Sequence, residues 1–217
     1  MSSSKFLTIG SQGASPETLR QAAHALRNNE LVVAPTETRY GLLARADSTE
    51  ALDLLRKVKM RGEHHAVAVF ARSRAEIEKW GDVNDRVARL VDTFMPGPLT
   101  MVLKAKVNWP SPAVVDGRLG IRWSSCLLIQ RLLEEVDAPI TATSANLSGR
   151  PEHERVQEIR DDFGDAVAVY LDAGVLRGKS STVIDCTQDK LVILREGAIA
   201  ADRILAAADR IQNGQND

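Results

Sequence analysis

Short apolar runs alternate with amphipathic helical patterns along most of the chain, and this alternation is the feature that most limits its fold. The run 31–34 (Leu-Val-Val-Ala) stops at Pro35 and predicts a buried strand. Downstream, Leu54, Leu55 and Val58 recur at helical spacing. Strands that alternate with helices are typical of α/β proteins. We therefore expect an α/β fold in which helices flank a twisted, mixed, open sheet.

Capping residues mark where the first two helices begin. Ser15 followed by Pro16 predicts the start of one helix, and Asp47 with Glu50 has the spacing of a capping box for the next. That second helix should end near Lys59, with Gly62 as its terminator. Further helices are expected at 87–94, 127–136, 156–163 and 204–211, and further strands at 66–70, 99–103, 119–123, 139–143, 166–171, 182–186 and 191–194.

The bulk properties describe an ordinary globular chain. Its 217 residues contain no linker and no repeat, so we expect one domain over 1–217 with a core at about 15–212. A net charge of -1 argues against a dedicated nucleic-acid binder. The chain has no run of about 18 apolar residues and no apolar signal region, and Cys126 and Cys186 are far apart. These features predict a cytoplasmic protein with reduced thiols and no membrane contact.

Five polar or turn segments interrupt this pattern, at 35–41, 59–61, 96–100, 141–149 and 181–185 with Arg195 beyond. Thr36 and Thr38 follow a strand, where α/β proteins gather their ligands. Lys59 and Arg61 end a helix and can converge on a polyphosphate if the chain has unwound there. Each segment alone also has an ordinary explanation: a strand exit, a solvated basic helix end that complements the dipole, or a polar loop.

Several familiar chemistries are absent from the sequence. Gly178-Lys179-Ser180 resembles the end of a P-loop, but Ala173 stands where the first glycine belongs, and the following residues predict a strand. The four histidines have no metal-ligand spacing to a cysteine, so we expect no protein metal site. Cys186 falls in a buried strand, where thiols are usually inert.

The order and spacing of the five segments, over roughly 31–199, resemble the YrdC-type (TsaC-like) threonylcarbamoyl-AMP synthase family in its short, single-domain form. The resemblance implies a YrdC-like fold with a concave basic pocket. It also implies that L-threonine, bicarbonate or CO2, and ATP with Mg²⁺ give threonylcarbamoyl-AMP and pyrophosphate. Downstream tRNA-modification proteins would use this product, and the resemblance leaves room for a contact with tRNA or double-stranded RNA.

The resemblance also assigns roles by position. Lys59 and Arg61 would be catalytic at the ATP phosphates, and Arg122 would pair with the threonine carboxylate. The ATP-binding set is Lys59, Arg61, Arg118, Ser144, Asn146 and Arg195, and the threonine-binding set is Thr38, Arg122 and Ser181.

The chain departs from the family pattern around this pocket. Arg39 replaces the usual Val, Leu43 a Gly, and Trp123-Ser124-Ser125-Cys126 the usual Pro and His after Arg122. Residues 62–67, with His64 and His65, also differ. The sequence leaves open whether these changes alter the acceptor. The alternatives are an RNA-binding module without catalysis, a paralogue that adenylates or carbamoylates another acceptor, and an inactive relative.

Overall fold

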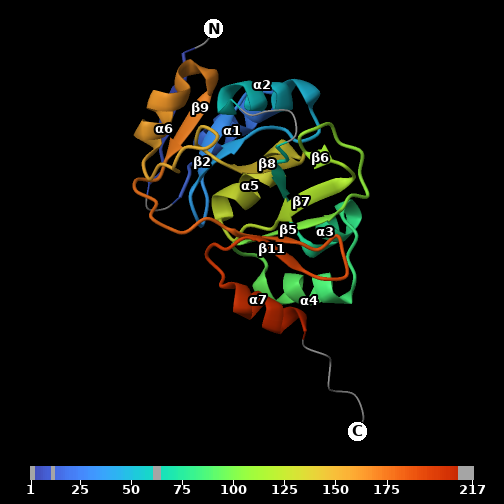
Figure 1. Ribbon diagram of the computed structural model, residues 1–217. Helices are drawn as coiled ribbons and strands as arrows, with labels where there is room; N and C mark the ends of the chain where they lie inside the picture. Colours follow the sequence, from blue (N-terminus) through green and yellow to red (C-terminus); the bar gives the residue numbers. More distant parts are fainter. Residues whose placement is uncertain (1–2, 11–12, 61–64, 210–217) are drawn as a thin grey trace.

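A single mixed sheet organises the protein (Figure 1). The computed structural model describes residues 3–10, 13–60 and 65–209. The strands are β1 (Lys5–Thr8), β2 (Val32–Pro35), β3 (Tyr40–Leu43), β4 (Ala68–Phe70), β5 (Leu99–Lys104), β6 (Val114–Val115), β7 (Arg118–Arg122), β8 (Ile140–Ser144), β9 (Val169–Asp172), β10 (Thr182–Asp185) and β11 (Val192–Arg195). Within the described ranges these form one 11-stranded sheet in the order β1-β9-β2-β3-β8-β4-β7-β5-β10-β11, and β6 pairs with β7.

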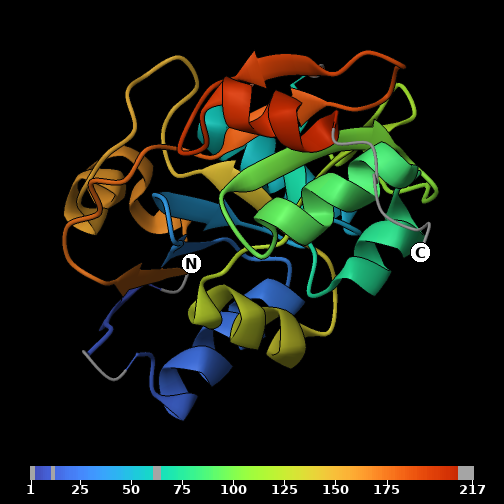
Figure 2. The same ribbon diagram turned by 90° about the horizontal axis from the view of Figure 1, so that it is seen from below.

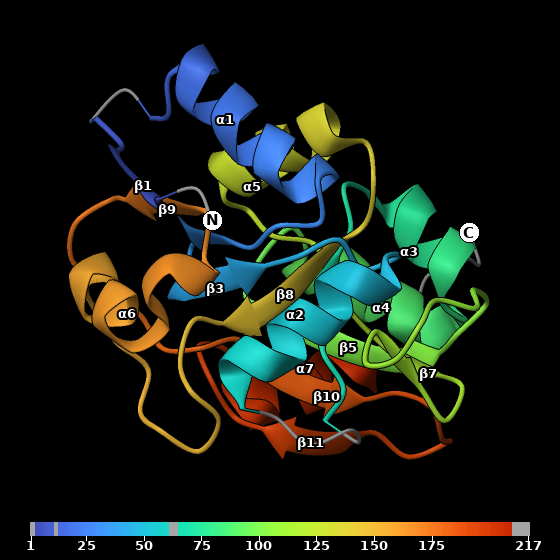
Figure 3. The same cartoon turned by 90° about the horizontal axis from the view of Figure 1, so that it is seen from above.

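Helices pack on the sheet. They are α1 (Pro16–Arg27), α2 (Thr49–Lys59), α3 (Arg74–Trp80), α4 (Asp85–Phe94), α5 (Leu127–Val136), α6 (Val156–Phe163) and α7 (Ala201–Ala208), with a 3-10 turn at Gly164–Ala166. Figures 2 and 3 show α1 and α5 side by side on one side of the sheet, and Figure 2 shows α4 and α7 together on the other. Parallel pairs such as β5 with β10 mix with antiparallel pairs such as β5 with β7, which confirms the expected mixed α/β sheet.

Strand β2 has apolar contacts on both faces, as its continuous apolar run predicts. Val32 and Ala34 belong to the core beneath α1 and α5, together with Leu26, whereas Val33 belongs to the larger core that includes Leu55 of α2. Successive side chains of a strand point to opposite faces, so a strand covered on both sides needs an apolar residue at every position.

The predicted helices and strands are mostly confirmed. The helices expected at 127–136 and 156–163 have those boundaries in the structure, and Ser15 caps α1 by accepting a hydrogen bond from the N–H of Thr18. The last helix begins earlier than predicted, at Ala201, and Ile211 lies outside the described residues. The sequence patterns did not predict β1, α3 and β6, which are short elements of two to seven residues.

The polar or turn segment predicted at 35–41 is too long, because Tyr40 and Gly41 belong to β3, which pairs antiparallel with β2. The two strands form a hairpin whose turn is closed by Thr36. Its hydroxyl accepts hydrogen bonds from the N–H groups of Thr38 (3.1 Å) and Arg39 (3.2 Å), and its own N–H donates to the Arg39 carbonyl (3.1 Å). These local bonds hold residues 36–39 in one conformation.

The capping box predicted at Asp47 is off by one residue. Ser48 is the N-cap of α2, and its hydroxyl accepts a hydrogen bond from the N–H of Ala51 at 3.3 Å. Asp47 instead forms an ion pair with Arg45, with 3.0 Å between Nε and Oδ1. A serine hydroxyl one residue closer to the helix therefore takes the capping role.

The other end of α2 agrees with the prediction. The helix ends at Lys59 because Met60 adopts the left-handed backbone conformation, with φ at 52°. The predicted terminator, Gly62, lies outside the described residues. No helix in ranges 3–10, 13–60 or 65–209 has the length and apolar character that crossing a membrane requires.

We predict that Ser48→Ala lowers the free energy of unfolding by about 1 kcal/mol, because the Ala51 N–H then loses its acceptor. Asp47→Ala removes only a partly exposed ion pair and should cost about 0.5 kcal/mol. Urea denaturation of both variants measures the difference. A larger loss for Asp47→Ala would contradict the assignment of Ser48 as the cap.

Candidate functional site

A cavity of about 480 Å³ lies on one face of the sheet. Alternate residues of neighbouring strands line it, as expected for side chains that share a face. These are residues 100 and 102 of β5, 118, 120 and 122 of β7, and 183 and 185 of β10, whereas β8 contributes three successive residues, 142–144.

Three small residues leave space for the cavity on this face of the sheet. Ala68 of β4 lies opposite Gly120 on one side and Ala142 on the other, so the three are cross-strand neighbours. A Cβ atom at Gly120 would lie 3.0 Å from the Cβ of Ala68, closer than side-chain carbons normally approach. Small side chains at this position in three adjacent strands leave room above the sheet for a ligand.

The cavity brings together six of the nine predicted site residues. The six are Thr38, Arg118, Arg122, Ser144, Ser181 and Arg195. Two others, Lys59 and Asn146, lie next to Ser144 outside the lining, and Arg61 lies outside the described residues. Segments that are far apart in the chain therefore converge on one space.

Arg122 is a buried cation in the cavity wall. Its side chain belongs to β7 and is only 6% exposed. One of its terminal nitrogens, Nη2, donates a hydrogen bond to the hydroxyl of Thr38 (2.9 Å). The same nitrogen lies 2.9 Å from Oε1 of Glu37, and this contact is an ion pair that lacks the alignment of a hydrogen bond. The guanidinium carbon lies 5.7 Å from the centre of the Phe70 ring. These contacts fix the orientation of a fork that matches a carboxylate.

Glu37 was not predicted as a site residue. Its other carboxylate oxygen accepts a hydrogen bond from the hydroxyl of Ser124, which in turn accepts from the N–H of Cys126 (3.1 Å). Ser124 and Cys126 belong to the segment that departs from the family pattern. The departure therefore supplies a buried support for the Glu37–Arg122 pair.

Lys59 is fully buried at the end of α2. Its ammonium donates hydrogen bonds to the carbonyl of Ser144 and to the carbonyl of Asn146 (2.9 Å). The Ser144 hydroxyl donates to the side-chain carbonyl of Asn146 (2.5 Å), and the Asn146 amide donates to the carbonyl of Arg150 (2.6 Å). The lysine thus holds the chain where it leaves β8 and where Ser144 enters the cavity wall.

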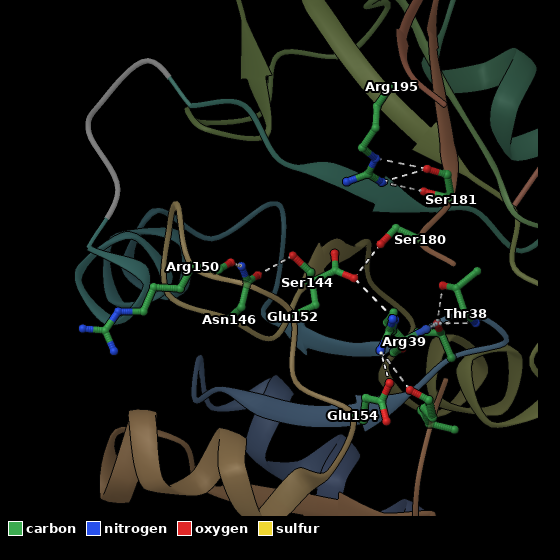
Figure 4. Close-up of polar contacts among 12 residues, drawn as sticks. Thr38, Arg39, Ser144, Asn146, Arg150, Glu152, Glu154, Ser180, Ser181 and Arg195 are labelled. Carbon is green, nitrogen blue, oxygen red and sulfur yellow. Dashed lines mark hydrogen bonds and ion pairs between the residues drawn. The ribbon is translucent and has the colours of Figure 1, made fainter. Parts of the chain in front are cut away.

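The other side of the cavity is formed by β5, β7, β10 and β11. Figure 4 shows Arg195 directed at Ser181, and its Nε and Nη2 donate to the Ser181 carbonyl at 3.2 and 2.8 Å. The hydroxyls of Ser181 and Thr100 lie 3.0 Å apart. Arg118 is half exposed, and its Nη1 lies 3.4 Å from Oδ2 of Asp185.

Both signs of charge line the cavity. The charged lining residues are Arg39, Arg118, Arg122 and Arg195, with Asp116, Glu152 and Asp185. Arg39 is held by two carboxylates, with 3.7 Å from Nε to Glu152 and 3.7 Å from Nη1 to Glu154. Since Arg118 also contacts Asp185, several cations here already have anionic neighbours.

The cysteines remain unpaired, as predicted. Burial raises the pKa of the Cys186 thiol to about 12 and also raises the pKa of the Cys126 thiol. Both groups therefore stay protonated near neutral pH, and the predicted inertness of Cys186 has a physical basis.

Comparison with known proteins shows the family. The chain belongs to the Sua5/YciO/YrdC family, whose model carries the description "Telomere recombination" and matches residues 24–197. It is 35% identical over 192 residues to the threonylcarbamoyl-AMP synthase of Bacillus subtilis, covering 87% of this chain and 56% of the relative. It is 33% identical to the protein of the same name from Pyrococcus abyssi, covering 86% of this chain and 56% of that relative. The chain thus spans about half the length of these two relatives.

Two solved structures share the fold. The crystal structure of P. abyssi Sua5 complexed with L-threonine superposes with a TM-score of 0.87 and 28% identity, covering 94% of this chain and 61% of that one. The crystal structure of Escherichia coli YciO superposes with a TM-score of 0.82 and 27% identity, covering 89% and 96%. These similarities confirm the YrdC-like fold.

The cavity also contains one of the two tyrosines of the chain. Tyr40 donates a hydrogen bond from its hydroxyl to the carbonyl of Gly174 (2.7 Å). Burial raises its pKa to about 12, and burial also raises the pKa of Tyr170 well above its usual value. Folding thus favours the protonated hydroxyl of Tyr40. This preference stabilises the folded state below about pH 10, and the stabilisation is lost as the pH rises towards 12.

We therefore predict that neither tyrosine ionises near pH 10 in the native protein. Absorbance titration of tyrosinate measures this directly. Protein unfolded in guanidinium chloride is the control and should titrate at about pH 10. A native transition at that pH would contradict the burial of these hydroxyls.

Proposed function

We propose that this protein is an L-threonylcarbamoyladenylate synthase, a nucleotidyltransferase that joins L-threonine, bicarbonate or CO2, and ATP. The observation that carries the proposal is that six residues, assigned by position to ATP and threonine, line one cavity. Membership of a family with relatives named threonylcarbamoyl-AMP synthase supports it.

The threonine side of the proposed site is formed by Thr38, Arg122 and Ser181. Arg122 binds the substrate carboxylate, because a buried guanidinium presents parallel N–H donors to a planar anion. Thr38 and Ser181 offer hydroxyl groups to a small polar substrate. The structure of P. abyssi Sua5 complexed with L-threonine supports a threonine site in this fold.

The nucleotide side is formed by Arg118, Ser144 and Arg195 in the lining, with Lys59, Asn146 and Arg61. In this proposal Ser144 donates to a phosphate oxygen, and Lys59 holds the Ser144 and Asn146 carbonyls while adding positive charge beside the phosphates. The role of Arg61 at the phosphates remains a prediction from the Lys-x-Arg motif.

The reaction needs positioning more than acid–base catalysis. The threonine amine loses a proton and adds to CO2, giving an N-carboxylate. One oxygen of this carboxylate attacks the α-phosphorus of ATP, and the bond to pyrophosphate breaks. The protein brings two anions together and offsets their repulsion, which is how phosphoryl-transfer sites obtain most of their rate enhancement.

Mg²⁺ should enter with ATP. In nucleotide sites this ion is held by one or two carboxylates, by water and by substrate phosphates, and it neutralises charge on those phosphates. Asp116 and Asp185 line the cavity and fit that donor set. Among the residues that the structure describes, no three His, Cys, Asp or Glu side chains cluster as a separate metal site. The product would then pass to proteins that modify tRNA.

Adenylation of a different acceptor is the second candidate. Arg39 and Glu152 both line the cavity, and Arg39 is one of the departures from the family pattern. The chain also covers 96% of E. coli YciO, a relative described as uncharacterised. A changed acceptor would leave the nucleotide side intact.

We predict that the purified protein releases pyrophosphate from ATP only when L-threonine and bicarbonate are both present. A coupled pyrophosphate assay with each component omitted in turn measures this. Release without L-threonine, or with another amino acid only, would favour the second candidate. Absence of ATP binding would overturn both.

We further predict that Lys59→Ala lowers the rate of adenylate formation about 100-fold or more, as the loss of a charge contact near a transition state often does. Lys57→Ala is the matched control, since Lys57 is an exposed lysine of the same helix turn. Thermal unfolding of both variants shows whether the buried contact also stabilises the fold. Equal rates of adenylate formation for the two variants would show that Lys59 is not part of the site.

A further inference from the structure

Arg39 connects three separate segments at the cavity wall. Figure 4 shows it between Glu152 and Glu154, and Glu152 also contacts Ser180. We call Arg39, Glu152, Glu154 and Ser180 the bridge. Arg39 belongs to the β2–β3 turn, the two glutamates follow β8, and Ser180 precedes β10.

The segment that carries Ser180 makes a long crossing. Residues 173–181 lead from β9, near one edge of the sheet, to β10, near the other. Their other anchors also lie at the β2–β3 hairpin and at Glu154: the Leu176 carbonyl accepts from Nη1 of Arg39 (3.1 Å), and the Leu176 N–H donates to the Glu154 carbonyl (2.9 Å). Gly178 passes so close to Thr38 that a Cβ there would lie 2.6 Å from the Thr38 carbonyl oxygen.

The bridge ends beside residues of the proposed site. Ser180 is followed directly by Ser181, whose carbonyl and hydroxyl are contacted by Arg195. Arg39 follows Thr38, which is bonded to Arg122. A change in the bridge can therefore displace Thr38 and Ser181, two threonine-side residues, at once.

The charges of the bridge are shielded from bulk water only in part. The side chains of Arg39 and Glu152 are 21% and 22% exposed. Attraction between partly buried charges is screened less than attraction between fully exposed ones. Glu152 also accepts a hydrogen bond from the Ser180 hydroxyl. The position of Ser180 in the crossing segment therefore depends on where Arg39 holds the Glu152 carboxylate.

We propose that Arg39 is a positioning residue for the threonine side of the cavity. Through Glu152 and the Leu176 carbonyl it holds residues 173–181 against the β2–β3 turn, and it thereby sets where Ser181 stands relative to Thr38. This inference rests on the proposed function for its effect on catalysis. Arg39 itself is not a catalytic residue in this view.

Arg39→Ala in the full chain tests the proposal, with Arg177→Ala as the matched control. Arg177 also pairs with Glu154 (3.4 Å), but it is 77% exposed and is not among the described residues that line the cavity. Arg39→Ala should raise KM for L-threonine roughly tenfold, because small displacements of positioning groups weaken productive binding strongly. Its KM for ATP and its kcat should stay within about twofold of the wild-type values, and Arg177→Ala should resemble wild type throughout.

A conservative variant tests how the effect is transmitted. Glu152→Gln keeps an acceptor for Ser180 and loses the ion pair with Arg39, so its KM for L-threonine should fall between wild type and Arg39→Ala. Equal changes of kcat and of both KM values in Arg39→Ala, together with a lower melting temperature, would mean that Arg39 only stabilises the fold and would overturn the proposal.

Hydrogen exchange provides a readout that does not need activity. Backbone amides of residues 173–181 should exchange faster in Arg39→Ala than in wild type or Arg177→Ala. Unchanged exchange would overturn the positioning role. If wild type shows no threonine-dependent pyrophosphate release but residues 173–181 still exchange faster in Arg39→Ala, the bridge is supported and the proposed function is rejected. The two failures are therefore distinguishable.

Discussion

The buried ammonium of Lys59 is the interaction on which the arrangement of the site depends. A fully buried charge is costly unless its hydrogen bonds are satisfied, and here the carbonyls of Ser144 and Asn146 accept them. The contact joins the end of α2 to the end of β8. It therefore sets one wall of the cavity, and the loop that carries Glu152 starts from this point.

Three arginines that line the cavity are paired with carboxylates. Arg122 is held by Glu37, Arg118 by Asp185, and Arg39 by two glutamates. A buried guanidinium that already has a carboxylate neighbour keeps its position without a ligand, at the expense of part of its attraction for an anion. A cavity lined in this way can hold an anion in a fixed orientation, and its own carboxylates moderate its affinity for anions.

Local patterns predicted most of the helices and strands, and they failed where a neighbouring residue offered a competing local bond. The capping box at Asp47 was wrong because Ser48 lies one residue nearer the helix. The turn segment at 35–41 was too long because Thr36 closes the hairpin before Tyr40. Glu37 and Glu152 were missed as site residues, since a single carboxylate in a loop carries no pattern, and their importance follows from the arginines that they contact.

The sequence by itself determined the α/β class, the positions of most strands and helices, and the motifs that resemble a known family, because these depend on periodicity and spacing along the chain. Only the tertiary structure decided how distant segments meet. Ala68, Gly120 and Ala142 are unremarkable in three separate strands, and strand register places them side by side as the floor of the cavity. Register depends on contacts between segments far apart in sequence, which no local pattern encodes.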